Sequence, residues 1–250
     1  MRIENSFLPV RGIGEKTERR LWREGITHWD AFDESAVGDA QGRNIREFIE
    51  QGRDRLAAGD ADFFYEAFPS GSRWRLYENF RPRTCFFDIE TTGLDARSSD
   101  VTTVSFHRAG ETTTLVQGED LTRAALATEL RAADLLVSFN GKRFDVPFLE
   151  QSFDLDIDRP HLDLLYACRQ LDLTGGLKAI EREVGIDRDR PDLSGRDAVR
   201  LWHAHERGDE DALDTLVSYN RADTKNLENL LDIVTDRLHD DVFVAACDGR

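Results

Sequence analysis

Two acidic residues stand at the end of a segment that otherwise has the pattern of a buried β-strand. The segment is CFFDIETTGL, residues 85–94, and its first three residues form a continuous apolar run, typical of a strand covered on both faces. Asp88 and Glu90 are two residues apart, so both side chains point to the same face of the strand. Buried carboxylates that repel each other are stabilised by a divalent cation, whereas acids at a strand end that has reached solvent are simply hydrated. This segment alone leaves both interpretations open.

From residue 84 onwards, segments with a strand pattern alternate with segments with a helix pattern. Strands are predicted at residues 84–90, 101–107, 111–117, 134–139 and 161–166. Helices are predicted at residues 120–132, 144–152, 176–184, 195–207 and 210–238. Gly110 lies in the three-residue gap between the second and third strands, which indicates a hairpin. A hairpin followed by this alternation predicts an α/β domain with a mixed five-stranded sheet flanked by helices.

The first 83 residues have a different pattern. Residues 7–58 are typical of short helices joined by glycine turns, and Gly12-x-Gly14 precedes a helix that ends at Gly25. Residues 59–83 are rich in aromatic side chains and are expected to be irregular. The sequence therefore predicts a small all-α module at residues 1–58, a connector at residues 59–83 and the α/β domain at residues 84–250.

The composition excludes several classes of protein. The sequence has no run of 18 apolar residues and no apolar signal segment at its start, so we expect no membrane partner. Its three cysteines, Cys85, Cys168 and Cys247, are far apart, which excludes a disulfide framework and a thiolate zinc site. These features predict a soluble protein of a reducing, cytoplasmic compartment.

The charge is unevenly distributed along the chain. The formal net charge is -16, and residues 84–250 carry 34 acidic against 19 basic residues. Residues 1–83 are nearly balanced, with 15 acidic and 14 basic residues. An acidic surface repels a polyanion, which counts against a nucleic-acid substrate. Only four of the 33 basic residues are lysine, and this scarcity favours a halophilic organism, in which molar salt screens such repulsion within about 3 Å.

Two further acids, Asp145 and Asp223, lie on predicted helices next to apolar segments. In FNGKRFD, residues 139–145, Asp145 opens an amphipathic helix after a turn, where the helix dipole alone would also favour an acid. Tyr219 and Asp223 are four residues apart on one side of the helix predicted at residues 210–238. The alternative for this pair is an ordinary contact between tyrosine and aspartate at the edge of the core.

Taken together, DIETTGL, FNGKRFD and Tyr-x-x-x-Asp resemble the three exonuclease motifs of the DEDD superfamily, the DnaQ-like 3′-5′ exonucleases with an RNase H-like fold. The tyrosine of the last motif resembles the DEDDy subgroup. The motif acids Asp88, Asp145 and Asp223 occur in the family order at intervals of 57 and 78 residues, and three ordered motifs are far more specific than one. The resemblance covers residues 84 to about 235, and WRLY, before the first motif, resembles the predicted-exonuclease (YprB-like) branch.

The resemblance implies a two-metal phosphodiester hydrolase. Asp88, Glu90, Asp145 and Asp223 would bind two divalent cations, Mg²⁺ or Mn²⁺, which prefer oxygen ligands. Such a pair of cations activates water and neutralises charge on the leaving oxygen. Tyr219 would orient the attacking water, because a phenol with an unperturbed pKa of about 10 is a poor base at neutral pH.

The motifs also imply contacts with nucleic acid, most simply with a single-stranded 3′ end. Thr91 and Leu94 would contact the terminal nucleotide, and Asn140 and Phe144 would lie along the strand. The sequence leaves DNA or RNA open, and likewise exonuclease or structure-specific endonuclease. The alternative function is a non-catalytic nucleic-acid-binding or scaffolding protein, and the presence of all five catalytic motif residues argues against it.

Asp163 lies on a predicted apolar strand and has two interpretations. It supports the site from behind the ligands, or it is a solvated or hydrogen-bonded strand acid. It is not counted among the ligands. His161, His203 and His205 have no recurrent metal-binding spacing and are expected at the surface.

The amino-terminal segment GIGEKTERRLWREGI resembles a helix-hairpin-helix element. Backbone N–H groups around Gly12 and Gly14 would hold a phosphate without reading bases, and a packing device of two helices is the alternative. Arg73, Trp74 and Arg75 either stack on bases or, as we favour, pack the connector onto the sheet.

Overall fold

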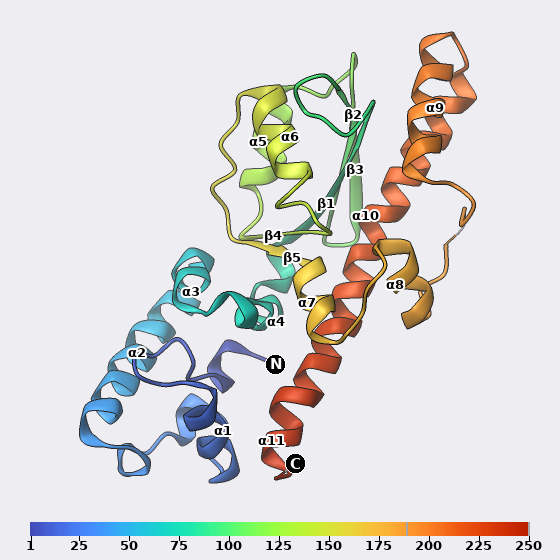
Figure 1. Ribbon diagram of the computed structural model, residues 1–250. Coiled ribbons are helices and arrows are strands. Elements are labelled where there is room, and N and C mark those ends of the chain that lie inside the picture. The colour runs from blue at the N-terminus through green and yellow to red at the C-terminus, as the bar shows by residue number, and fades with distance from the viewer. Residues whose placement is uncertain (189, 250) are drawn as a thin grey trace. The chain divides into compact units, whose positions relative to one another are not determined.

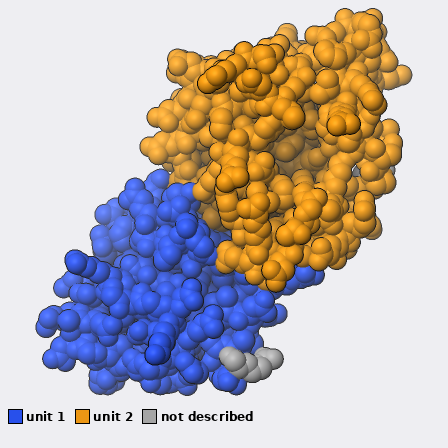
Figure 2. Space-filling view, viewed as in Figure 1, with its two compact units in different colours: residues 1–81, 233–250 blue, residues 82–232 orange. Residues whose placement is uncertain are grey.

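The computed structural model describes residues 1–188 and 190–249. These residues form two compact units (Figure 2). The helical unit comprises residues 1–81 and those from residue 233 onwards, and the sheet unit comprises residues 82–232. The predicted domain boundaries at residues 58 and 83 stay predictions. In the described chain, no helix is long and apolar enough to cross a membrane.

The sheet unit is built on five strands in the order β3-β2-β1-β4-β5. Its strands are β1 (Thr84–Thr91), β2 (Val101–Arg108), β3 (Glu111–Val116), β4 (Leu135–Ser138) and β5 (His161–Asp163). Strand β2 pairs antiparallel with both β1 and β3, whereas β4 pairs in parallel with β1 and with β5. The predicted α/β class and mixed five-stranded sheet are confirmed.

Helices flank this sheet. They are α5 (Arg123–Arg131), α6 (Asp145–Phe153), α7 (Leu164–Gln170), α8 (Leu177–Val184), α9 (Gly195–Glu206) and α10 (Glu210–His239). The helices α5 and α6 lie on one face of the sheet, and α10 crosses the other (Figure 1). The strand predicted at residues 161–166 is wrong in its second half, because the carboxylate of Asp163 caps α7 by accepting the N–H of Leu165.

The alternation of side chains along β1 decides what each face of the strand contacts. Cys85, Phe87 and Ile89 belong to the apolar core that includes residues of α5 and α6. Asp88 is on the opposite face, where Asn220 of α10 donates a hydrogen bond of 2.8 Å to its carboxylate. The period of two in a strand therefore directs the acids of β1 toward α10.

The helical unit is formed by both ends of the chain. Its helices are α1 (Glu15–Arg23), α2 (Asp39–Ala57), α3 (Ala61–Ala67) and α4 (Tyr77–Phe80), together with the end of α10, the π-helical segment Asp240–Val244 and α11 (Ala245–Cys247). Trp22 is buried, and its ring meets that of Phe243 edge-on at 5.0 Å between centroids. This contact joins the last residues of the chain to its first helix.

The segment predicted to be an irregular connector is largely helical. It contains α3, the 3₁₀ helix Ser70–Leu76 and α4. Arg75 is buried and forms an ion pair of 2.9 Å with Glu18, while the guanidinium of Arg73 lies 3.8 Å from the centroid of the Tyr65 ring. These contacts of Arg73 and Arg75 lie within the helical unit, and packing onto the sheet or stacking on bases stays a prediction. The sequence could not show these contacts, because the partner of Arg75 lies 57 residues away.

Candidate metal and active site

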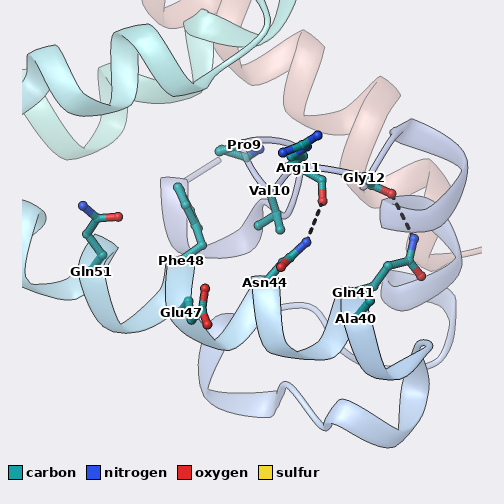
Figure 3. A pocket seen from close by; sticks show the side chains of 10 residues that line it. All are labelled: Pro9, Val10, Arg11, Gly12, Ala40, Gln41, Asn44, Glu47, Phe48 and Gln51. Carbon is teal, nitrogen blue, oxygen red and sulfur yellow. Dashed lines mark hydrogen bonds between the residues drawn. The ribbon is translucent and has the colours of Figure 1, made fainter.

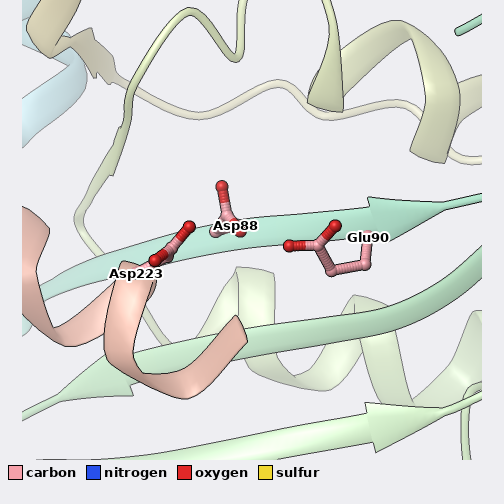
Figure 4. Close-up of side chains that lie close together, drawn as sticks. All are labelled: Asp88, Glu90 and Asp223. Carbon is pink, nitrogen blue, oxygen red and sulfur yellow. The ribbon is translucent and has the colours of Figure 1, made fainter. Parts of the chain in front are cut away.

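Three carboxylates from two elements converge beside the centre of the sheet (Figure 4). Asp88 and Glu90 come from β1, and Asp223 comes from α10. One carboxylate oxygen of each residue lies within 4.8 Å of one from each of the others. Oxygen donors this close together fit a hard divalent cation such as Mg²⁺ or Mn²⁺. The strand pattern and the helical motif thus meet in one cluster, as the sequence predicts.

The ionised forms of the cluster acids are destabilised by burial and by mutual repulsion. Burial raises the pKa of Asp88 well above its usual range, and the charges of Asp145, Glu90 and Asp223 raise it further. Burial likewise raises the pKa of Glu90, with further increases from the charges of Asp223 and Asp145. A cation among these acids would offset both the desolvation and the mutual repulsion.

Asp145, the fourth predicted ligand, is the first residue of α6 and is buried. Burial raises its pKa to about 7, while hydrogen bonds from the backbone of Asp145 and Ile89 counteract this rise. Its charge acts on Asp88 and on Glu90, so it belongs to the same electrostatic group. It lies outside the set of three carboxylates that approach one another most closely, and its role as a ligand stays a prediction.

Asp163 holds the turn that presents Asp145. Its buried carboxylate accepts the backbone N–H groups of Asn140 at 2.7 Å and of Lys142 at 3.2 Å. Asn140 has a φ of 63°, a left-handed conformation that asparagine tolerates better than most residues. A Cβ atom at Gly141 would collide with the Ser138 hydroxyl, so the turn requires glycine there. The Asp163 carboxylate is therefore a hydrogen-bonded acid and not a solvated one, and a role in supporting the site stays a prediction.

His161 is buried, and the prediction that it lies at the surface is wrong. Its Nε2 atom is 2.7 Å from the Ser138 hydroxyl. Burial lowers the pKa of His161 to about 3, so the ring is neutral at physiological pH. His203 is exposed, in agreement with the sequence, and His205 is partly exposed.

Tyr219 is buried next to Asp223 on α10. Burial raises its pKa, and the charges of Asp223, Glu90 and Asp88 raise it further. The phenol is therefore protonated, and its hydroxyl lowers the pKa of the neighbouring Asp223 carboxylate. A protonated hydroxyl at this position can orient water but cannot act as a general base at neutral pH.

Three residues near the cluster were not identified from the sequence. Asn220 donates to Asp88 and accepts from the Thr103 hydroxyl, which ties α10 to the sheet. Arg188 Nη1 lies 2.5 Å from Asp223 Oδ1, and its Nε donates to the buried Glu181. Lys178 Nζ lies 4.9 Å from the centroid of the Tyr219 ring. Asn220 follows a motif residue directly, but no sequence pattern marks the two cations.

The predicted substrate contacts have different environments. Leu94 is 88% exposed, although it follows the buried end of β1. The Thr91 hydroxyl donates to the carbonyl of Gly93, and the Phe144 ring packs at 4.8 Å on that of Phe148. The roles of Thr91, Leu94, Asn140 and Phe144 in substrate binding stay predictions.

A separate hollow of about 570 Å³ lies in the helical unit, between the turn around Gly12 and α2 (Figure 3). The side-chain amides of Gln41 and Asn44 donate to the carbonyls of Gly12 and Arg11, at 2.9 and 3.3 Å. Gly12 has a φ of 87°, whereas Gly14, which precedes α1, has a φ of -113°. Only Gly12 therefore needs the conformational freedom of glycine. Phosphate binding by Gly12 and Gly14, and the likeness to a helix-hairpin-helix, stay predictions.

The comparison with protein families assigns the class. The model of the RNase_H superfamily matches residues 85–235, and the chain belongs to this superfamily. The match contains the sheet from the second residue of β1 onwards, both acids of β1 and the part of α10 that carries Tyr219 and Asp223.

Solved structures with a similar arrangement include the family B DNA polymerase from the hyperthermophilic archaeon Pyrobaculum calidifontis. The TM-score is 0.52 at 16% sequence identity, over 65% of this chain and 26% of the polymerase, so this chain spans about a quarter of that protein. Brucella melitensis NrnC bound to pGG has a TM-score of 0.47 at 20% identity, over 69% of this chain and 81% of NrnC. No curated protein sequence matches the chain.

Proposed function

We propose that this protein is a metal-dependent DEDDy-type 3′-5′ exonuclease of the YprB-like branch, hydrolysing phosphodiester bonds of DNA or RNA. The observation that supports this most strongly is the cluster of Asp88, Glu90 and Asp223, with Tyr219 buried beside Asp223 on α10. A structural cluster would contain enough cations to balance its acids. This one has a single ion pair among the described residues, between Arg188 and Asp223.

The cluster acids, with Asp145 as the fourth carboxylate, would hold two divalent cations, Mg²⁺ or Mn²⁺. Bound there, these ions would lower the pKa of water and neutralise the charge that develops on the phosphate. A water oxygen attacks the phosphorus, the bond to the 3′ oxygen breaks, and the leaving oxygen takes up a proton to become a 3′ hydroxyl. Tyr219 positions the water, and Asn220 keeps Asp88 directed toward α10.

The proposed 3′-5′ direction of digestion depends on how side chains around the end of β1 would bind the 3′ end of a strand. Leu94 is an exposed apolar residue next to buried acids, which suits a contact with the last base of a single strand. Thr91, Asn140 and Phe144 would complete the binding of the terminal nucleotides, and Asp163 would keep Asn140 in place through its hydrogen bond.

The test is digestion of single-stranded DNA and RNA labelled at the 5′ end, with Mg²⁺ or Mn²⁺, at low and at molar salt. A 3′-5′ exonuclease gives a ladder of labelled products that shortens with time, and a chelator abolishes it. A circular single strand is the control, because an exonuclease leaves it intact and an endonuclease linearises it. Absence of cleavage with either metal at either salt concentration would reject the proposal and favour a non-catalytic binding protein.

A further inference from the structure

A groove of about 470 Å³ in the sheet unit has a charge opposite to that of its surroundings. We call it the cationic groove; its basic residues are Arg188, Arg190, Arg221 and Lys225. Asp187 is the one acid among its described lining residues. Acidic residues outnumber basic ones by 34 to 19 over residues 84–250, so four cations around one hollow are a marked local excess.

The cations of the groove differ in how far they are already neutralised. Arg188 is paired with Asp223 and Glu181, and Arg221 donates to the backbone carbonyl of Thr112. Arg190 is 54% exposed, and its Nε lies 3.7 Å from Asp192, a distance typical of a weak surface pair. Lys225 is exposed and forms no ion pair with any residue that the structure describes. Arg190 and Lys225 thus present charge that is available to an anion.

The groove adjoins the metal site. Tyr219 and Arg188 both line the groove, and both contact Asp223. The Arg188 side chain is only 8% exposed, and its buried Nη2 atom has no hydrogen-bond partner in the described chain. A buried guanidinium N–H without an acceptor is costly, and this one is free to donate to an anion that enters the groove.

Phosphate oxygens match these donors. Arginine and lysine neutralise backbone charge, and neutral side chains such as Ser218, Asn226 and Asn229, which also line the groove, donate to phosphate and sugar oxygens. Tyr219 is the one aromatic residue among the described lining residues, and it is buried. The groove therefore offers no exposed ring on which a base would stack. The groove is therefore suited to a nucleic-acid backbone and not to reading its bases.

We propose that the cationic groove binds the phosphodiester backbone of the substrate strand beside the bond that is cleaved, with Arg188, Arg190 and Lys225 as the phosphate contacts. This inference rests on the proposed function only in taking nucleic acid as the substrate. It explains how an acidic protein holds a polyanion, since local positive charge lies beside the site while the rest of the surface repels.

The test uses the double variant Arg190→Gln/Lys225→Gln, which leaves Arg188 and all the cluster residues unchanged. Its matched control is Arg123→Gln/Arg207→Gln, which removes the same charge from exposed residues of the sheet unit outside the groove. Binding of a fluorescent single-stranded oligonucleotide of about 12 nucleotides is measured by anisotropy, with chelator present to prevent cleavage, over a series of salt concentrations. Each phosphate contact on a single strand contributes about 0.7 to the slope of log affinity against log salt.

The groove variant is expected to bind about tenfold more weakly at low salt, with a slope smaller by about 1.4, while the control keeps the wild-type slope. In cleavage assays with Mn²⁺, its KM should rise and its kcat should stay within about twofold of wild type. Equal affinities and slopes for the two double variants would overturn the proposal that the cationic groove binds the phosphodiester backbone. If the wild type shows this binding through the groove but cleaves nothing, the proposed function is rejected and the proposal that the groove binds nucleic acid is retained.

Discussion

Each unit of the protein contains a buried cluster of charged side chains, and the two clusters are balanced differently. In the helical unit, Glu18 is 1% exposed and has partners for its charge. It accepts hydrogen bonds from the backbone N–H groups of Phe7 and Leu8, from the Ser6 hydroxyl and from the guanidinium of Arg75. One acid and one base of opposite charge, joined by an ion pair of 2.9 Å, form a structural network.

In the sheet unit, the acids exceed the bases. Asp88 and Glu90 have pKa values raised by burial and by their neighbours, and Asp88 is hydrogen-bonded by the neutral Asn220 rather than by a cation. Arg188 balances Asp223, but it is shared with Glu181. The comparison shows that burial of charge alone does not identify a functional site. A deficit of counter-charge distinguishes the cluster of the sheet unit, and bound cations would remove that deficit.

The largest effect is expected when one acid of the sheet-unit cluster is neutralised. Asp88→Asn should reduce the rate of metal-dependent cleavage by at least about 10³-fold, because it removes metal stabilisation worth several kcal/mol at about 1.36 kcal/mol per tenfold. The thermal midpoint of the metal-free protein should stay the same or rise, since a repelling charge is lost. Steady-state kinetics and thermal unfolding measure the two quantities. Activity within tenfold of wild type would show that Asp88 is not a ligand.

Tyr219→Phe should reduce kcat by a factor on the order of 10²–10⁴, the range for a positioned proton-transfer group. The ring that packs with Trp202 and Leu216 is kept, so the loss would come from the hydroxyl alone. Tyr166→Phe is the matched control, because Tyr166 is 40% exposed and lies outside the cluster. If both variants keep wild-type kcat, the hydroxyl of Tyr219 has only a structural role.

In the helical unit, the effect should appear in stability rather than in chemistry. Glu18→Ala leaves the Arg75 guanidinium buried without its carboxylate, and breaking such a pair costs about 3–5 kcal/mol. Chemical denaturation measures this loss. The double variant Glu18→Leu/Arg75→Met should lose less than Glu18→Ala alone, since no charge is left unpaired. An exposed pair, Arg20 with Glu24, is the control, and Glu24→Ala should cost less than about 1 kcal/mol.

The smallest effect is a pH dependence of metal stabilisation. Burial raises the pKa of Asp145 to about 7, so the folded metal-free protein keeps a proton that the unfolded chain loses near pH 4. Between about pH 4 and pH 7 the unfolded state therefore binds fewer protons than the folded state. The contribution of Asp145 to stability falls over this range and is lost once the pH has risen through about 7. Cations bind the ionised carboxylate, so the rise in thermal midpoint with Mn²⁺ should grow between about pH 6 and pH 8.

Thermal unfolding with and without Mn²⁺ at several pH values measures this difference. His161, whose pKa is lowered to about 3, titrates alike in both series and cancels. Asp145→Asn should reduce the dependence on pH, and Asp88 and Glu90, whose pKa values are also raised, should maintain the remainder. A rise in midpoint that is equal at all pH values in the wild type would contradict the assignment.

The part of the site that follows from local periodicity could be predicted from the sequence. Asp88 and Glu90 share a face because a strand repeats every two residues, and Tyr219 is beside Asp223 because a helix brings residues four apart together. The mixed sheet follows in the same way from the hairpin and the alternation of elements. These relations depend only on short-range geometry.

The counter-charges could not be predicted, because they depend on contacts between distant segments. Arg188 meets Asp223 across 35 residues, and Glu18 meets Arg75 across 57. The same reason explains the error on His161, which is covered by the fold and not by its own sequence neighbours. Nothing in the local pattern distinguishes Arg75, which is buried in the helical unit, from Arg190, which is exposed at the groove.

The helical unit is assembled from both ends of the chain, and this has a consequence for biosynthesis. Trp22 emerges from the ribosome early, whereas its ring partner Phe243 is translated 221 residues later. The unit cannot complete its core before the segment around Phe243 has been translated, so the nascent chain carries exposed aromatic side chains until then. The sheet unit, residues 82–232, is continuous in the sequence and contains all three carboxylates of the cluster. It can therefore fold before the helical unit, whose first residues precede it in the sequence.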